Sequence, residues 1–173
     1  PRSDKSFTVK LGGHVIEDWS DGTLRIRHED ASIVEALPYD VMVSGYENKG
    51  VSVLRLWRAS APASFDMKSF TQGDYFKAMR GDNEAELISK VLYPSDEHFE
   101  GKQLRLSQQY FLVSASLQSI IKDHLKHYDT LDNLADKVAI HINDTHPALA
   151  IPELMRLLLD EYGFSWERAW DIT

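Results

Sequence analysis

The chain has 173 residues, 43% of them hydrophobic and 10% aromatic, which suits one domain or a large part of one. Its formal net charge of −8 argues against nucleic-acid binding, because a phosphate-backbone partner requires concentrated Lys and Arg. The absence of cysteine excludes disulfide scaffolds, thiolate metal sites and cysteine nucleophiles. No signal peptide or long apolar span is recognisable, so we expect a cytoplasmic protein without a membrane partner.

The first third of the chain has the pattern of β-strands. Apolar and polar residues alternate over 7–11 and again over 24–28, and a third run extends from Val51 to Trp57. The dipeptides Gly12-Gly13 and Asp21-Gly22 are turn signals between the first two runs. Short strands separated by turns predict an antiparallel meander with one covered face and one face exposed to water.

Helical periodicity begins near Tyr75. Apolar residues at helical spacing predict a helix over 75–92, which Pro94 cannot continue. A clearer stripe predicts a second helix that ends near Leu125. Its apolar positions are Leu106, Tyr110, Val113, Leu117 and Ile120. A shorter turn or helix is predicted over 129–136, with Thr130 as its cap.

The run Val138–Ile142 is short, apolar on both sides and bounded by polar residues, which predicts a buried parallel strand. Pro152 suits the first turn of the following helix, and Gly163 suits the position after its end. The residues predicted to be buried on this helix are Leu154, Met155, Leu158 and Tyr162. Ser165 is expected to cap a last short helix. We therefore predict an α/β fold that is part of a doubly wound domain, with an N-terminal antiparallel β region followed by helices and at least one buried parallel strand.

Asp144 and His146 directly follow the predicted parallel strand. Ligands of open α/β sheets lie outside the carboxyl ends of the strands, where a carboxylate and an imidazole can bind a sugar hydroxyl or orient a proton carrier. Polar residues before a proline also close turns and cap helices, so a purely structural role is the alternative. From the residues alone the two interpretations of His146 are equally good, Asp144 leans towards the structural one, and His141 is typical of a packing histidine.

Two other chemistries have weaker support. A metal hydrolase would use His141, Asp144 and His146, but strand alternation separates His141 from the other two and no HExxH motif occurs. The loop 93–101 carries three acids, as a glycosidase would need, yet neighbouring acids ahead of a helix more often interact with its dipole. We therefore predict neither a metal site nor a hydrolase.

The remaining polar and aromatic residues are given structural interpretations. Arg105 is expected to pair with Glu100 or Asp96. Aromatic residues near strand ends, such as Tyr39, Tyr46 and Trp57, are more typical of a core than of a sugar platform. Neither GxGxxG nor GxxxxGK[ST] occurs, so the chain has no glycine-rich phosphate loop.

Several separated strings resemble the α-glucan phosphorylase family, which includes glycogen, starch and maltodextrin phosphorylases. They occur in family order over nearly the whole chain. The strings are Pro38-Tyr39-Asp40, Gly45-Tyr46, Leu54-Arg55-Leu56-Trp57, Val91-Leu92-Tyr93-Pro94, Phe99-Glu100-Gly101-Lys102, Leu104-Arg105-Leu106, Gln109-Tyr110-Phe111, Asn143-Asp144-Thr145-His146-Pro147 and Ala150-Ile151-Pro152-Glu153-Leu154. The resemblance places residues 1–173 in the later part of the N-terminal domain, as a single partial domain. The start at Pro1 and the end at Thr173 add to the expectation of a fragment.

By this resemblance, the parent enzyme transfers terminal α-1,4-glucosyl units to inorganic phosphate and releases glucose 1-phosphate, in a cleft between two doubly wound domains. The family's pyridoxal phosphate acts through its phosphate group, and the lysine that binds it belongs to the second domain, which is absent here. The resemblance thus implies that this chain binds neither cofactor nor metal and holds no complete catalytic set. The fragment alone is predicted to be inactive.

The resemblance also implies which residues bind substrate. His146 matches the histidine that lines the glucosyl subsite, with Asp144 beside it. The gate loop over the entrance to the active site matches Ser95, Asp96, Glu97, His98 and Phe99, of which Asp96 and Glu97 are also assigned to substrate binding. The helix 75–92 matches one that packs against a partner subunit, so the parent is expected to be a homodimer. The competing hypothesis is a self-standing carbohydrate-binding or dimerisation module that keeps the fold without the chemistry.

Overall fold

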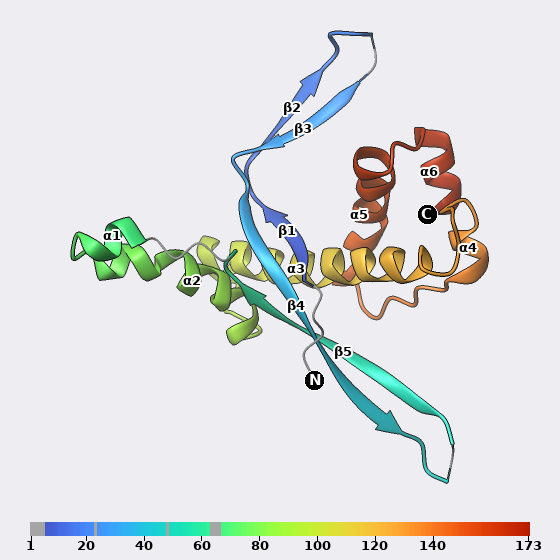
Figure 1. Ribbon diagram of the computed structural model, residues 1–173, viewed down its shortest axis with the longest axis horizontal. Helices are drawn as coiled ribbons and strands as arrows, with labels where there is room; N and C mark the ends of the chain where they lie inside the picture. Colours follow the sequence, from blue (N-terminus) through green and yellow to red (C-terminus); the bar gives the residue numbers. More distant parts are fainter. Residues whose placement is uncertain (1–5, 23, 48, 63–66) are drawn as a thin grey trace. The chain divides into compact units, whose positions relative to one another are not determined.

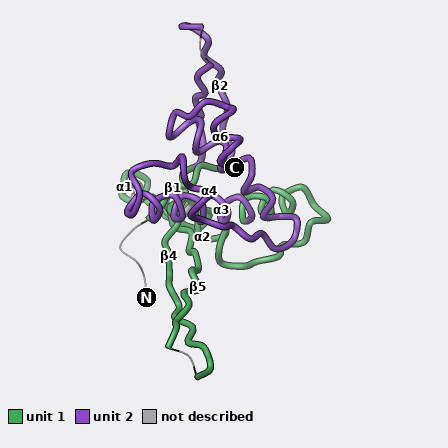
Figure 2. Tube along the Cα trace, turned by 90° about the vertical axis from the view of Figure 1, so that its right-hand side faces the viewer, with its two compact units in different colours: residues 1–11, 33–108 green, residues 12–32, 109–173 purple. Residues whose placement is uncertain are grey.

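The computed structural model describes residues 6–22, 24–47, 49–62 and 67–173, which form two compact units. Unit 1 comprises the described residues of Pro1–Leu11 and Ile33–Gln108, and unit 2 those of Gly12–Ser32 and Gln109–Thr173 (Figure 2). The long helix α3 (Phe99–His124) contributes its first turns to unit 1 and its remainder to unit 2.

Unit 1 contains a three-stranded sheet in the order β1-β4-β5, formed by β1 (Phe7–Leu11), β4 (Ser32–Ser44) and β5 (Val51–Ser60). Strands β4 and β5 pair antiparallel from Glu35↔Ser60 to Ser44↔Val51. Because β1 is much shorter than β4, the far end of this pair is a two-stranded ribbon (Figure 1). The strands expected over 7–11 and 51–57 are confirmed. The sequence analysis missed β4, in whose middle Pro38 is fully buried, because a proline argues against a central strand.

Two helices follow this sheet, α1 (Met67–Thr71) and α2 (Tyr75–Lys90). Helix α2 packs against β5, and its buried residues are Ala78, Ala85 and Ile88. The Ser89 hydroxyl accepts a hydrogen bond from the backbone N–H of Ala59 at 2.9 Å, which fixes the helix on the strand. The helix predicted over 75–92 is therefore confirmed, whereas the short helix α1 was not predicted.

Unit 2 begins with the antiparallel hairpin of β2 (His14–Asp18) and β3 (Arg25–Glu29), which confirms the strand expected near 24–28. The turn residue Gly13 has a φ of 82°, and a Cβ atom there would lie only 2.4 Å from the Glu29 carbonyl oxygen. Glycine is therefore required where the chain enters the hairpin.

The rest of unit 2 is helical and holds the main core. After α3 come α4 (Leu134–Lys137), the 3-10 turn η1 (His146–Leu149), α5 (Ala150–Arg156), the π-helical turn η2 (Leu157–Glu161) and α6 (Trp166–Ile172). The buried cluster is formed by Val113, Leu117, Ile121, Leu131, Leu134, Leu154, Met155, Leu157, Leu158, Ala169 and Ile172. The hydroxyl of Ser165 accepts the N–H of Arg168 at 3.3 Å, which confirms the predicted cap of α6.

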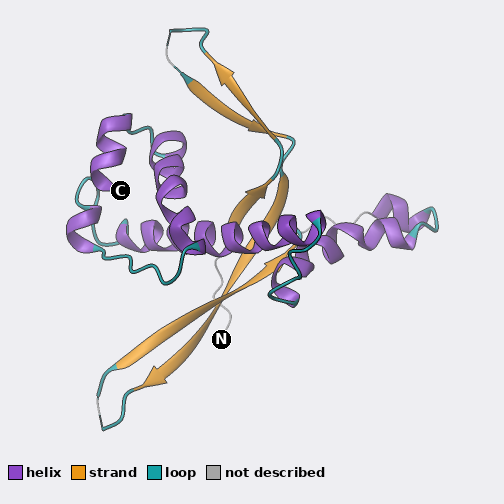
Figure 3. Ribbon diagram, turned by 180° about the vertical axis from the view of Figure 1, so that it is seen from behind, coloured by secondary structure: helices purple, strands orange, loops and turns teal. Residues whose placement is uncertain are grey.

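The predicted strand Val138–Ile142 does not form. The segment is loop (Figure 3), and Ile140 and Ile142 are exposed. A parallel strand requires a hydrogen-bonded neighbour, and no described strand lies beside this segment. The described chain thus shows an antiparallel β region followed by helices, without the parallel strand of a doubly wound sheet.

Several smaller predictions, made for residues of both units, are also wrong. The residue that caps α4 is Asn133 rather than Thr130, whose hydroxyl instead bonds within the preceding turn to Asp132. Leu106 and Tyr162, both predicted to be buried, are exposed. Tyr46, for which a core position was favoured, is also exposed. No helix in the described ranges is both long enough and apolar enough to cross a membrane.

Candidate functional site

Asp144 and His146 lie at the start of the helical segment formed by η1 and α5, in unit 2. His146 Nδ1 is 3.8 Å from Asp144 Oδ2, and the two side chains are 38% and 63% exposed. The Asp144 backbone has a φ of 73°, a left-handed conformation that is uncommon outside glycine. Its Oδ1 atom accepts the N–H of Thr145 at 2.7 Å, which stabilises this conformation. The structure thus brings the two predicted residues together, with Asp144 exposed and His146 half-buried.

The orientation of this pair depends on the helix that follows it. Pro147 occupies the first turn of η1, where its fixed φ suits a helix and its missing N–H costs little. The N–H of Ala148 bonds to the Thr145 carbonyl at 3.0 Å, and the N–H of Ala150 bonds back into η1. The site segment is therefore a direct extension of α5, and it moves only if α5 moves or this junction breaks.

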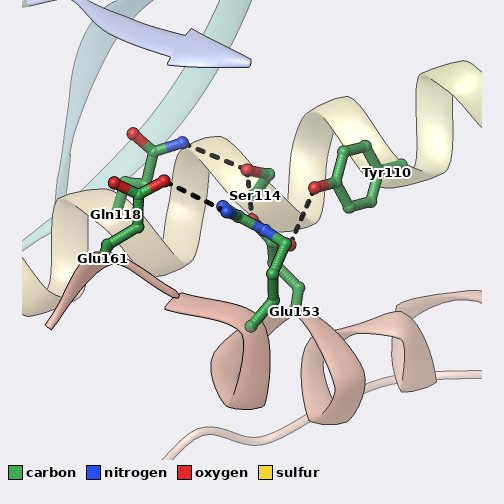
Figure 4. Close-up of polar contacts among 6 residues, drawn as sticks. Tyr110, Ser114, Gln118, Glu153 and Glu161 are labelled. Atoms are coloured by element: carbon green, nitrogen blue, oxygen red, sulfur yellow. Dashed lines mark hydrogen bonds and ion pairs between the residues drawn. The ribbon is translucent and has the colours of Figure 1, made fainter. Parts of the chain in front are cut away.

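Helix α5 carries a buried acid, Glu153, which the sequence analysis did not assign a role. Its side chain is only 1% exposed. The carboxylate accepts hydrogen bonds from the Tyr110 hydroxyl at 2.7 Å and the Ser114 hydroxyl at 2.6 Å, both on α3 (Figure 4). Arg156, one turn later on the same helical segment, donates to it from Nε at 2.8 Å and from an Nη atom at 3.1 Å. A buried carboxylate is tolerated only when it is paired and hydrogen-bonded in this way.

Two side chains that bond to Glu153, those of Tyr110 and Arg156, have shifted pKa values. Burial, followed by the hydrogen bond to Glu153, raises the pKa of Tyr110 to about 12, so its hydroxyl stays protonated and donates. Burial alone would lower the pKa of Arg156, but its hydrogen bonds and attraction to Glu153 raise it overall. Arg156 also reaches Glu161 at 3.1 Å. The only sequence signal was an acid within an otherwise apolar helix face, three residues before an arginine.

The predicted gate loop lies in unit 1, whereas Asp144 and His146 lie in unit 2. Asp96 of this loop pairs with Arg105 of α3 at 3.0 Å, which confirms the expected ion pair. A Cβ atom at Gly101 would lie 1.7 Å from the Ser95 carbonyl oxygen, so the loop can fold against α3 only because residue 101 is glycine. Glu97 and His98 are exposed, as is the side chain of Phe99 at the start of α3.

The arginines and the potential metal ligands of the described residues have the following surroundings. Every arginine whose side chain is described lies within 4.0 Å of a carboxylate: Arg25, Arg27, Arg55, Arg58, Arg105, Arg156 and Arg168. In the part of the chain that the structure describes, no three His, Asp or Glu side chains are grouped as metal ligands would be. His141 therefore does not form a cluster of three with Asp144 and His146.

A family model described as carbohydrate phosphorylase matches residues 1–173. The chain belongs to the carbohydrate phosphorylase family. It is 50% identical to a glycogen phosphorylase of Pasteurella multocida over 172 residues, which are 99% of this chain and 20% of that protein. A Bacillus subtilis glycogen phosphorylase is 50% identical over 171 residues, again 99% of this chain and 20% of the relative.

The human muscle form of glycogen phosphorylase is 46% identical over 182 residues, covering 99% of this chain and 21% of that protein. The chain therefore spans about one fifth of the length of the relatives that it matches. Family membership confirms the resemblance seen in the separated strings from Pro38 to Leu154. It leaves the roles of individual side chains to be argued from their positions.

Proposed function

We propose that this chain is part of an α-glucan phosphorylase that transfers terminal α-1,4-glucosyl units to inorganic phosphate and releases glucose 1-phosphate. The observation that carries the proposal is the match over all 173 residues to a family whose relatives are glycogen phosphorylases. In this proposal the chain is the later part of the first domain. A second domain, outside these residues, completes the active site.

Within this assignment, His146 and Asp144 bind the glucosyl unit that is transferred. Their neighbouring side chains supply one imidazole and one carboxylate, which suit the hydroxyl groups of a sugar. Asp96 and Glu97 bind substrate from the gate loop Ser95–Phe99, whose position depends on Gly101 and on the Asp96–Arg105 ion pair. An exposed polar loop held at one end by a helix suits a gate better than a core.

The catalytic set is incomplete in this chain. Pyridoxal phosphate, which the family uses, supplies a phosphate group for proton transfer when it is bound. A phosphate site requires preorganised cationic or N–H donors, and the arginines with described side chains all face carboxylates. We therefore assign binding of the cofactor to the second domain. The fragment alone is therefore proposed to be inactive.

The proposed longer protein would explain two features of the structure, the loop Val138–Ile142 and the exposed side chains of helix α2. The loop Val138–Ile142 exposes Ile140 and Ile142 here, and we propose that it becomes a buried parallel strand once neighbouring strands of a doubly wound sheet are present. Helix α2 exposes Tyr75, Phe76, Met79 and Leu87, which suits the packing of a homodimer through the 75–92 region. Cytoplasmic location follows from the same assignment.

Phosphorolysis of maltoheptaose tests the proposal. The full-length protein and the 173-residue chain would each be given maltoheptaose, phosphate and pyridoxal phosphate, and glucose 1-phosphate would be measured. We expect product only with the full-length protein. Absence of product with the full-length protein would refute the activity, and cofactor-dependent turnover by the chain alone would show that the essential residues are misassigned.

Substitution of His146 tests the site assignment. His146→Ala in the full-length protein is expected to reduce kcat/KM for maltoheptaose by about 100-fold, as removal of a positioned polar group in an active site does. His141→Ala, five residues earlier and outside the proposed site, is the matched control and should retain most of the activity. Equal losses in the two variants would contradict the assignment of His146 to substrate binding.

A further inference from the structure

Helix α5 is fixed on α3 by polar contacts whose members belong to no proposed substrate site. The Glu153 carboxylate receives the hydroxyl groups of Tyr110 and Ser114, which are one turn apart on α3 (Figure 4). Gln118, a further turn along α3, donates to the Ser114 oxygen at 3.1 Å. These contacts fix the rotation of α5 about its own axis and its position along α3. Apolar packing alone tolerates small slides and rotations.

Asp144 and His146 lie at the N-terminal extension of this same helix. From residue 146 to residue 153 the helical path is roughly 10 Å long, at 1.5 to 2 Å of rise per residue. A tilt of about 10° around Glu153 would therefore displace the imidazole of His146 by about 2 Å. Displacements of about 1 Å at a reacting group can cost about 100-fold in rate.

We propose that Glu153 is a positioning residue for the glucan site. By accepting hydrogen bonds from Tyr110 and Ser114, its carboxylate sets the height and rotation of α5 and thereby the place of Asp144 and His146. This inference rests on the proposed function, because it assumes that His146 contacts the glucosyl unit. Arg156 has a separate role, since its main contacts neutralise the buried carboxylate from within the same helical segment. It also interacts with the Tyr110 hydroxyl, so the Ser114 hydroxyl is the donor from α3 that acts on Glu153 alone.

The test uses the full-length protein and removes the two α3 donors one at a time. Tyr110→Phe and Ser114→Ala each delete one hydroxyl and leave the Glu153–Arg156 ion pair in place, so both variants are expected to fold. We expect each to lower kcat/KM for maltoheptaose by about 10-fold and the double variant by about 100-fold. The KM for phosphate should stay within about twofold, because phosphate is bound elsewhere.

Leu131→Ala is the matched control. Leu131 is a buried member of the same core cluster, in the connection between α3 and α4, and does not contact Glu153 through any described hydrogen bond. This substitution should lower the thermal midpoint at least as much as Ser114→Ala does, with kinetic constants close to those of the wild type. It therefore separates loss of stability from loss of position.

The outcomes are distinguishable. If the hydroxyl deletions lower the thermal midpoint but leave kcat/KM for maltoheptaose at the level of Leu131→Ala, Glu153 is purely structural and the inference is overturned. If they raise the KM for phosphate by as large a factor as they lower kcat/KM for maltoheptaose, the effect is not local to the proposed site and the inference is also overturned. A wild-type protein without phosphorolysis would refute the proposed function itself, together with this inference.

Discussion

The helical part of unit 2 and the β4–β5 ribbon of unit 1 differ in the burial of their apolar side chains. Unit 2 buries its apolar stripes against one another, with Leu158 and Ile121 almost fully enclosed. The ribbon exposes apolar side chains on successive residues, and therefore on both of its faces. These exposed residues are Val41, Met42, Val43, Val51, Val53, Leu54 and Leu56.

This difference shows which part of the chain supplies its own core. A two-stranded ribbon has too little surface to cover both of its faces, and isolated ribbons of this kind are only marginally stable in water. Exposed apolar patches of this extent are typical of surfaces that other protein covers. We therefore expect unit 2 to account for most of the stability of the isolated chain, and the ribbon to promote self-association.

The largest effect is expected from Glu153→Ala, in the buried polar cluster of unit 2. The substitution leaves the half-buried Arg156 without its main partner, and removing one member of a buried pair costs about 3–5 kcal/mol of the free energy of unfolding. Glu161→Ala removes the exposed carboxylate that faces the same arginine, and surface pairs contribute about 0–1 kcal/mol. Urea unfolding followed by circular dichroism measures both. Similar losses would mean that the cluster is less enclosed than its geometry indicates.

The comparison of core and ribbon is tested directly by two leucines. Leu158→Ala opens a cavity in the core of unit 2 and should cost about 3 kcal/mol. Leu54→Ala, on the half-exposed face of the ribbon, should change the free energy of unfolding by no more than about 0.5 kcal/mol. The same unfolding experiment serves for both variants. Comparable losses would contradict the division into a closed core and an uncovered ribbon.

A smaller effect is expected at the start of α6. Ser165→Ala removes the side-chain acceptor for the N–H of Arg168 and should cost about 1 kcal/mol. Ser165→Asn keeps a capping oxygen and should remain close to the wild type. Thermal unfolding measures the difference between the two variants. An unchanged midpoint for Ser165→Ala would show that α6 is held by its buried Ala169 and Ile172 alone.

The last prediction is a pH dependence of the stability that arises from Tyr110. Because the pKa of its hydroxyl is raised to about 12 in the folded chain from 10.0, the folded state keeps a proton that the unfolded state loses. This contribution to stability is fully present below pH 10 and decreases as the pH rises towards 12. The free energy of unfolding of Tyr110→Phe should fall less steeply over the same interval. Parallel curves for the two proteins would show that Tyr110 does not titrate in this way.

Much of the local structure was predictable because it follows from short-range patterns. The alternation of apolar and polar residues predicted β1 and β5, and helical spacing followed by Pro94 predicted α2. The serine before Trp166 predicted the cap of α6. The errors have physical reasons. Strand β4 contains a proline in its middle, and the 138–142 run has strand character but no strand to pair with among the described residues.

Only part of the candidate site could likewise be predicted from short-range sequence patterns. A polar run before a proline predicted Asp144 and His146 as site residues, and the separated family strings predicted the gate loop and the parent enzyme, because these patterns lie in consecutive residues. The Glu153 cluster was not identified, since Tyr110 and Ser114 are about forty positions away and meet the carboxylate only after α5 packs on α3. The sequence by itself determined the family and most of the helices, and it drew attention to Asp144 and His146. Only the tertiary structure decided which acid is buried and which strand pattern remains a loop, because burial and strand pairing depend on neighbours that are distant along the chain.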